Sequence, residues 1–146
     1  MRTERPVFFA VFLVLILFAG FTAAQDNPLE KYKWKNRLVI AFISSSDESR
    51  FAETTALYED QLKERDVIVI TCSVPEKPMG PAAGPGKSKC ELLRSLYGVS
   101  GEENTFVLIG KDGTEKLRQS GTPDFGVIIK TIDQMPMRII EKEKPE

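Results

Sequence analysis

The sequence predicts an α/β domain, a three-layer sandwich in which helices flank a mixed, mostly parallel central sheet. Three observations support this fold class. Residues 37–43 (RLVIAFI), 67–71 (VIVIT) and 105–110 (TFVLIG) are short, continuous apolar runs, as expected of strands that are covered on both faces. Amphipathic helical patterns separate these runs along the chain. The last run leads into a turn and a more polar stretch, which indicates one antiparallel return.

The chain begins with the pattern of an export signal at residues 1–24. Arg2 and Arg5 form a basic start, residues 7–20 are an uncharged apolar run, and small residues up to Ala24 predict cleavage after that position. The uncharged stretch is slightly short for a membrane-spanning helix, so a retained anchor is the alternative. We therefore expect an exported protein, periplasmic or extracellular, that meets a membrane only if the signal is retained.

Residues 25–36 read as a lead-in segment before the domain, which we place at residues 37–140. Tyr32 and Trp34 alternate with lysines here, and such patches can bind nucleic acid. The net charge of the whole chain is only −1, which argues against a nucleic-acid partner. We expect the two aromatic rings to pack on the sheet edge while the lysines stay solvated.

A strand–helix–strand unit comes next. Residues 44–50 (SSSDESR) read as the connecting turn, and the helix is expected from Phe51 onward. Phe51, Tyr58 and Leu62 recur at helical spacing and predict its buried face. This order places the strands before and after the helix in parallel, with a right-handed crossover.

The chain has two cysteines, Cys72 and Cys90, on either side of a segment rich in proline and glycine. In an exported protein an even cysteine count favours a structural disulfide, which would stabilise a loop of this size by roughly 3 kcal/mol. A redox-active pair is the alternative, although catalytic cysteines are usually closely spaced at a helix N-terminus.

The second half of the chain predicts a short helix and a hairpin. Residues 90–99 have a helical apolar pattern that ends at Gly98. After the third apolar run, residues 111–114 (KDGT) form a strong turn signal, and residues 115–119 are expected to return as a polar edge strand.

The last predicted helix has its start and end signals in the sequence. Thr122 is the expected N-cap, Pro123 occupies the first helical position, and Pro136 interrupts the helix. Residues 141–146 (EKEKPE) are expected to form a charged tail that is solvated and mobile.

Composition excludes several kinds of catalytic site. The chain contains no histidine, the usual proton carrier at neutral pH and a common metal ligand. A Ser-His-Asp triad, a histidine-rich zinc site and a Cys–His pair are therefore impossible. No cofactor and no metal are predicted.

Three stretches carry a resemblance to a known family. They are residues 34–37 (WKNR), 105–113 (TFVLIGKDG) and 132–138 (IDQMPMR). Together they resemble the peroxiredoxin-like domain of unknown function called P-DUDES, found in small exported bacterial proteins and in sushi-repeat and extracellular-matrix proteins. The resemblance covers roughly residues 28–141. It implies a fold of the thioredoxin-like superfamily and an extracytoplasmic setting, but no known reaction.

In thioredoxin-like domains the loop after the first strand normally carries Cys-x-x-Cys or a lone reactive cysteine. By position, Asp47 and Arg50 stand here where the two cysteines would be. Neither side chain can replace a sulfur nucleophile. The proline that thioredoxins place before the third strand is also absent, and Asn104 and Thr105 stand there instead.

Two interpretations of this loop remain. In the first, Ser45 is the N-cap of the helix and Glu48 completes a capping box. In the second, the loop binds a sulfate, phosphate or carboxylate at the helix N-terminus. The residues of that possible anion site are Ser44, Ser45, Ser46, Asp47, Ser49 and Arg50.

The sequence thus favours an exported thioredoxin-like domain that acts as a non-catalytic binding or interaction module. Its partner would be an unknown protein or a small anionic ligand. The alternative is an atypical thiol oxidoreductase that uses Cys72 and Cys90.

Overall fold

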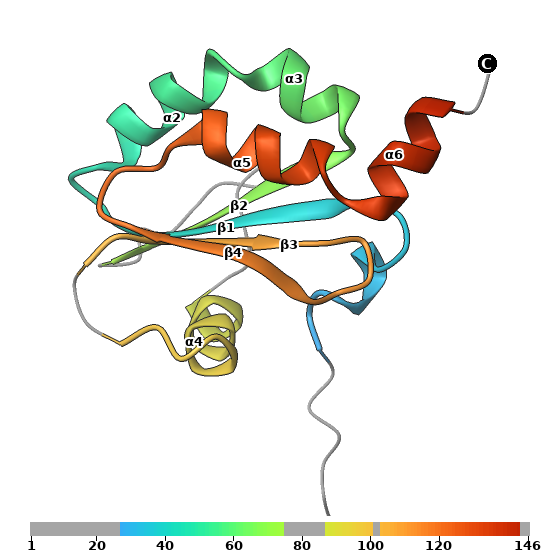
Figure 1. The fold of residues 1–146 in the computed structure, drawn as a ribbon. Helices are drawn as coiled ribbons and strands as arrows, with labels where there is room; N and C mark the ends of the chain where they lie inside the picture. The colour runs from blue at the N-terminus through green and yellow to red at the C-terminus, as the bar shows by residue number, and fades with distance from the viewer. Residues whose placement is uncertain (1–26, 75–86, 101–102, 144–146) are drawn as a thin grey trace, which may run out of the picture.

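The computed structural model describes residues 27–74, 87–100 and 103–143. These residues form a four-stranded sheet with helices on both faces, which confirms the predicted α/β sandwich (Figure 1). The expected signal at residues 1–24 and most of the segment between the cysteines lie outside the described residues. In chain order the elements are the 3-10 helix η1 (Glu30–Tyr32), β1 (Arg37–Ser44), α2 (Glu48–Ala56), α3 (Glu59–Glu64), β2 (Val67–Val74), α4 (Lys87–Leu96), β3 (Thr105–Ile109), β4 (Glu115–Ser120), α5 (Phe125–Asp133) and α6 (Pro136–Glu143).

The strand order is β2-β1-β3-β4, with β1 and β3 at the centre. β1 pairs with β2 in parallel, from Arg37 opposite Val67 to Ser44 opposite Val74. β3 runs antiparallel to both β1 and β4. The sheet is therefore mixed: β1, β2 and β4 share one direction, although only the β1–β2 pairing is parallel.

The central strand β1 supplies both cores because its side chains alternate between the two faces of the sheet. α2, α3 and α5 cover one face, and α4 covers the other (Figure 1). The first core combines Val39, Ala41, Ile43, Phe51, Leu62, Phe106, Leu108, Phe125, Ile128 and Ile132. The second combines Leu29, Leu38, Ile40, Phe42, Ile70, Cys72, Cys90, Leu93, Val107 and Ile109.

The helix predicted from Phe51 onward begins earlier and is divided in two. α2 starts at Glu48 and ends at Ala56, and α3 starts at Glu59. The hydroxyl groups of Thr54 and Thr55 donate to the carbonyls four residues before them, at 2.8 and 2.7 Å, a contact that bends helices. Phe51, Tyr58 and Leu62 still pack in one core, as predicted.

In the lead-in segment, the two aromatic residues behave differently. Tyr32 is partly buried and packs against the second core, as expected. Trp34 is 63% exposed, so the expectation that it packs on the sheet edge is wrong.

The N-cap predicted for the last long helix is also wrong. The cap of α5 is Asp124, not Thr122, and its carboxylate accepts a hydrogen bond from the backbone N–H of Val127 at 3.0 Å. The amide side chain of Gln119 bonds both the N–H and the carbonyl of Asp124. This contact from β4 fixes the cap in place, and the sequence pattern did not contain it.

The chain after Pro136 is folded as far as Glu143. Pro136 does interrupt the helix, since α5 ends at Asp133, but it also begins the eight-residue helix α6. Glu141 makes ion pairs with Arg37 and Lys111, at 3.1 and 2.7 Å. The expectation of a solvated tail from residue 141 is therefore wrong for residues 141–143.

Candidate functional site

The loop that was compared with the cysteine-bearing loop of thioredoxin-like domains connects the end of β1 to the start of α2. The backbone turns tightly there, because the N–H of Asp47 donates to the carbonyl of Ser44 at 3.1 Å. The N-cap of α2 is Asp47 rather than Ser45, and its side chain makes no capping bond. The predicted capping box of Ser45 and Glu48 is therefore wrong.

The side chain of Asp47 points instead to the start of β3. The amide of Asn104 donates to Asp47 Oδ2 at 2.8 Å, and its carbonyl oxygen accepts from the backbone N–H of Ser44 at 3.0 Å. The Ser44 hydroxyl also donates to Asp47 Oδ2, at 2.8 Å. These contacts exist because β3 runs antiparallel to β1, which brings residue 104 beside the end of β1. Asn104, the residue before β3, thus holds the loop in place.

This geometry stabilises the charged form of the Asp47 carboxyl. The hydrogen bond from Asn104 lowers its pKa most, followed by the bond from Ser44, and the charge of Arg50 acts in the same direction. Asp47 is therefore ionised at neutral pH, and its negative charge lies at the start of α2.

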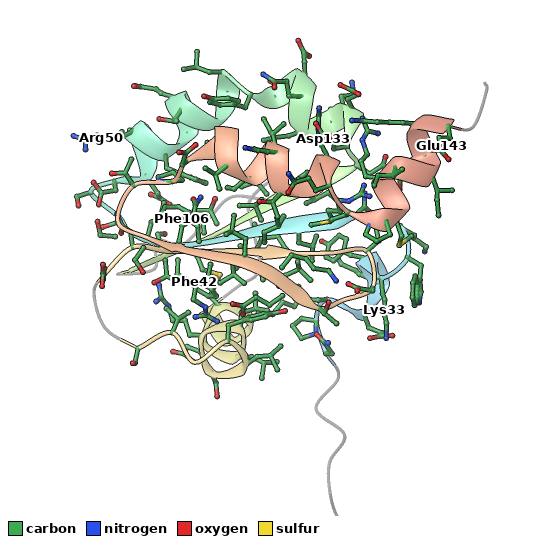
Figure 2. All side chains as sticks on the ribbon, viewed as in Figure 1. Lys33, Phe42, Arg50, Phe106, Asp133 and Glu143 are labelled. Atoms are coloured by element: carbon green, nitrogen blue, oxygen red, sulfur yellow. A yellow bond between two sulfur atoms is a disulfide. The ribbon has the colours of Figure 1, made fainter. Side chains whose placement is uncertain are left out.

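The six residues predicted for this loop divide into two groups. Ser44, Ser46 and Asp47 form one hydrogen-bonded cluster, in which the hydroxyl oxygens of Ser44 and Ser46 lie 2.7 Å apart. Ser49 and Arg50 are exposed on the first turn of α2 and Ser45 is half-buried. Figure 2 shows Arg50 at the outer end of the molecule, pointing to solvent.

The two cysteines form a disulfide that joins β2 to α4, with their Cα atoms 5.5 Å apart. Cys72 is fully buried and Cys90 is 3% exposed, and both belong to the core on the α4 face of the sheet. The guanidinium of Arg94 donates to the carbonyl of Cys72 at 3.1 Å and lies 5.1 Å from the ring centre of Phe42. The bridge is thus part of a packed layer.

A second polar cluster lies at the opposite end of the sheet, and sequence reasoning missed it. Arg37, the first residue of β1, is fully buried. It donates to the carbonyl of Arg65 at 2.9 Å and to both carboxylate oxygens of Glu141, at 3.1 and 3.2 Å. Lys111 donates to the same carboxylate and to Asp66, each at 2.7 Å. Burial raises the pKa of Glu141, but the hydrogen bonds from Lys111 and Arg37 outweigh it and hold this pKa below its usual value.

The ion pairs continue along the joint of α5 and α6. Arg65 makes two bonds of 2.9 Å to the carboxylate of Asp133, and Arg138 pairs with Glu64. The hydrogen bonds from Arg65 lower the pKa of Asp133 most, and the value reaches about 2. We name the cluster of Arg37, Arg65, Lys111, Asp133, Arg138 and Glu141 the charged end of the domain. Its members come from five separate parts of the chain, which is why no local pattern predicted it.

The described residues contain no group of three acidic, cysteine or histidine side chains that could hold a metal ion. Among these residues there is also no helix long and apolar enough to cross a membrane.

A model of the family described as "Domain of unknown function (DUF4174)" matches residues 28–141. No curated protein is a significant match to the sequence. Among solved structures, the chain is similar to the mitochondrial 2-Cys peroxiredoxin of Plasmodium falciparum, at 12% identity and a TM-score of 0.56, covering 80% of this chain and 84% of that one. It is also similar to the 2-Cys peroxiredoxin of Plasmodium vivax, at 22% identity, a TM-score of 0.53, and 79% and 72% coverage.

A third similar structure is the bacterioferritin comigratory protein of Xanthomonas campestris, at 14% identity, a TM-score of 0.51, and 67% and 76% coverage. At these identities the likeness shows the fold alone. The domain therefore has the thioredoxin-like, peroxiredoxin-like fold that the sequence predicted, and the chain belongs to the DUF4174 family.

Proposed function

We propose that this member of the DUF4174 family is an exported binding or interaction module without thiol redox activity. The observation that carries the proposal is the state of the loop after β1. The loop contains no cysteine, and the carboxylate of Asp47 in it is tied to Asn104 and Ser44. A carboxylate cannot undergo thiol redox chemistry, because it has no sulfur atom. Its negative charge would also repel an anion that bound to this loop.

The disulfide supports the same proposal. Exchange requires a thiolate to reach one of the sulfur atoms, and both cysteines of this bridge are buried in the core. Buried cysteines in apolar surroundings are generally inert, whereas catalytic ones are partly exposed. We therefore assign the Cys72–Cys90 bridge a structural role.

Export is part of the proposal as well. A stable disulfide is favoured in oxidising compartments such as the periplasm and the extracellular space, which agrees with the signal pattern of residues 1–24. The proposed mature protein begins at Gln25. Determining the N-terminus of the secreted protein tests this step, and a retained residue 1 would contradict it.

The competing function is a thiol oxidoreductase that cycles between the Cys72–Cys90 disulfide and two thiols. A redox titration of the mature protein separates the two. A structural bridge has a potential below about −300 mV, whereas catalytic bridges lie between about −270 and −120 mV. Peroxide consumption and insulin reduction should both be at background level.

The matched control is the variant with Cys72→Ser. If the mature protein turns over peroxide or insulin and this variant does not, our proposal is wrong and the oxidoreductase is right. A potential in the catalytic range with no turnover would overturn the structural role of the bridge alone.

A further inference from the structure

Three stretches that are far apart in the sequence meet around one cleft. Residues 34–37, 105–113 and 132–138 all contribute to its wall. The cleft has a volume of about 560 Å³ and lies at the charged end, at the opposite end of the sheet from the loop after β1. In Figure 2, Lys33 and Asp133 mark this end and Arg50 marks the other. Its lining includes Trp34, Arg37, Lys111, Lys116, Met135 and Met137.

Trp34 lines the cleft and has an unfavourable backbone conformation. Its φ angle is +65°, a region that bulky side chains rarely adopt and that costs of the order of 1–3 kcal/mol. The backbone N–H of Trp34 donates a hydrogen bond of 2.6 Å to the backbone carbonyl of Lys111, which holds this conformation in place. The result is an indole ring, 63% exposed, beside a cleft rather than in the core.

Two methionines line the cleft on the side of the α5–α6 joint. Met135 is partly buried and Met137 is exposed to 36%. Thioether side chains are flexible and polarisable, and they adapt to apolar ligands of different shape. Together with Trp34 they offer a surface for a flat apolar group.

Buried cations line the polar part of the cleft. Arg37 is fully buried and Lys111 is 9% exposed. Glu141 and Asp66 balance their charges, but the Nε–H of Arg37 has no acceptor among the described residues. A buried donor without a partner is costly, so the hydrogen bonding of Arg37 is incomplete in this part of the domain.

Lys116 adds a cation nearer to solvent. Its ammonium pairs with Asp112 at 2.6 Å, and its side chain is 32% exposed. Each of the three cations that line the cleft already has a carboxylate partner: Glu141 for Arg37, Asp66 and Glu141 for Lys111, and Asp112 for Lys116. Lys116 is the most exposed of the three, so it is the cation that an anionic group of a ligand can reach.

We propose that this cleft binds a small amphipathic molecule with a flat apolar body and one anionic group, such as a carboxylate or sulfonate. The apolar body lies against Trp34 and the two methionines, and the anionic group lies toward Lys116. The inference deepens the proposed function by placing its binding site. It fails independently, because a redox-active disulfide on the α4 face would leave the cleft unchanged.

Trp34 is the only tryptophan of the chain, so its fluorescence reports on the cleft directly. The probe is 8-anilino-1-naphthalenesulfonate, titrated into the mature protein with excitation of the tryptophan. We expect saturable quenching of Trp34 with energy transfer to the probe. The neutral analogue N-phenyl-1-naphthylamine should bind about tenfold more weakly, because it lacks the charged group.

Three variants locate the binding. Met137→Ala and Lys116→Ala should each weaken the sulfonate probe by about threefold to tenfold, and Lys116→Ala should leave the neutral analogue unchanged. Ile140→Ala is the matched control, since this residue of α6 is 54% exposed and is not part of the cleft wall. Circular dichroism confirms that each variant is folded.

Several outcomes would overturn the inference. Absence of quenching by both probes would show that the cleft binds no such molecule. Equal losses in Met137→Ala and Ile140→Ala would place the probe elsewhere on the surface. Equal affinity for the charged and neutral probes would show that the cleft does not recognise an anionic group, and that part of the proposal would be wrong.

Discussion

The two ends of the sheet are stabilised by different interactions: hydrogen bonds to one carboxylate at the end of β1, and buried ion pairs at its start. At the end of β1, the loop is closed around the half-buried carboxylate of Asp47 by hydrogen bonds from Asn104 and Ser44. At the start of β1, Arg37 is fully buried and is paired with Glu141 across 104 residues of sequence. Burying ions costs several kcal/mol each unless the pairing is nearly complete, so the charged end is the more demanding of the two.

This difference indicates which end of the domain is the better candidate for a binding site. The loop end is where thioredoxin-like domains normally hold their reactive cysteine, and here its polar groups satisfy one another. The charged end has two buried arginine Nε–H groups, of Arg37 and Arg138, without a hydrogen-bond acceptor among the described residues, and the exposed Trp34 lines the cleft beside it. Groups that remain unsatisfied or strained in a folded protein are candidates for binding.

The largest effect should come from Arg37. Arg37→Met removes the partner of the Arg65 carbonyl and one of the two main partners of Glu141. Breaking a buried ion pair from one side destabilises a fold by about 3–5 kcal/mol, which urea unfolding of the mature protein measures.

Arg50→Met is the control at the loop end. Arg50 is exposed, and its replacement should change the free energy of unfolding by about 0.5 kcal/mol or less. If both variants lose the same stability, then the two ends do not differ as we describe.

The charged end should also make stability depend on pH in the acid range. The pKa of Asp133 is lowered from 3.8 to about 2, mainly by hydrogen bonds from Arg65. A carboxyl whose pKa is lower in the folded state contributes stability above its unfolded pKa and loses it as pH falls through the folded one. We expect the free energy of unfolding to fall between about pH 4 and pH 2 for this reason.

Asp133→Asn should flatten that part of the pH profile, and the two curves should approach each other at pH 2. Asp60→Asn serves as the control, because Asp60 is exposed on α3. A profile of Asp133→Asn that runs parallel to the wild type would show that Asp133 is not the group responsible.

The smallest effect should be at the loop end. Asn104→Ala removes the acceptor of the Ser44 backbone N–H, which should cost about 1 kcal/mol. Ser45→Ala should leave the melting temperature nearly unchanged, because Ser45 is not the cap of α2. If Ser45→Ala instead lowered the free energy of unfolding by about 1 kcal/mol, that result would support the capping box of Ser45 and Glu48.

The order and type of most elements could be predicted from the sequence because they depend on local patterns. The continuous apolar runs became β1, β2 and β3, each within a few residues of the expected bounds. Phe51, Tyr58 and Leu62 share a core as their helical spacing predicted, although Phe51 belongs to α2 and Leu62 to α3. The cysteine count indicated the Cys72–Cys90 bridge. With only two cysteines in the chain, this pairing could be predicted without knowing the order of the strands.

The caps could not be predicted as reliably. Ser45 and Thr122 have the right chemistry for N-caps, but Asp47 and Asp124 occupy those positions. In both cases a side chain from a different strand or loop decides the outcome: Asn104 holds Asp47, and Gln119 holds Asp124. Hydrogen bonds of this kind add only about 1 kcal/mol, yet that is enough to choose between neighbouring cap positions.

The sequence by itself determined the fold class, the main strands and the absence of a thiol in the loop after β1. Only the tertiary structure decided that Glu141 is part of the domain, and that residues 34–37, 105–113 and 132–138 surround one cleft. The reason is physical. Apolar periodicity acts over a few residues and can be read along the chain, whereas ion pairs and clefts depend on the sheet order, which joins residues as distant as Arg37 and Glu141.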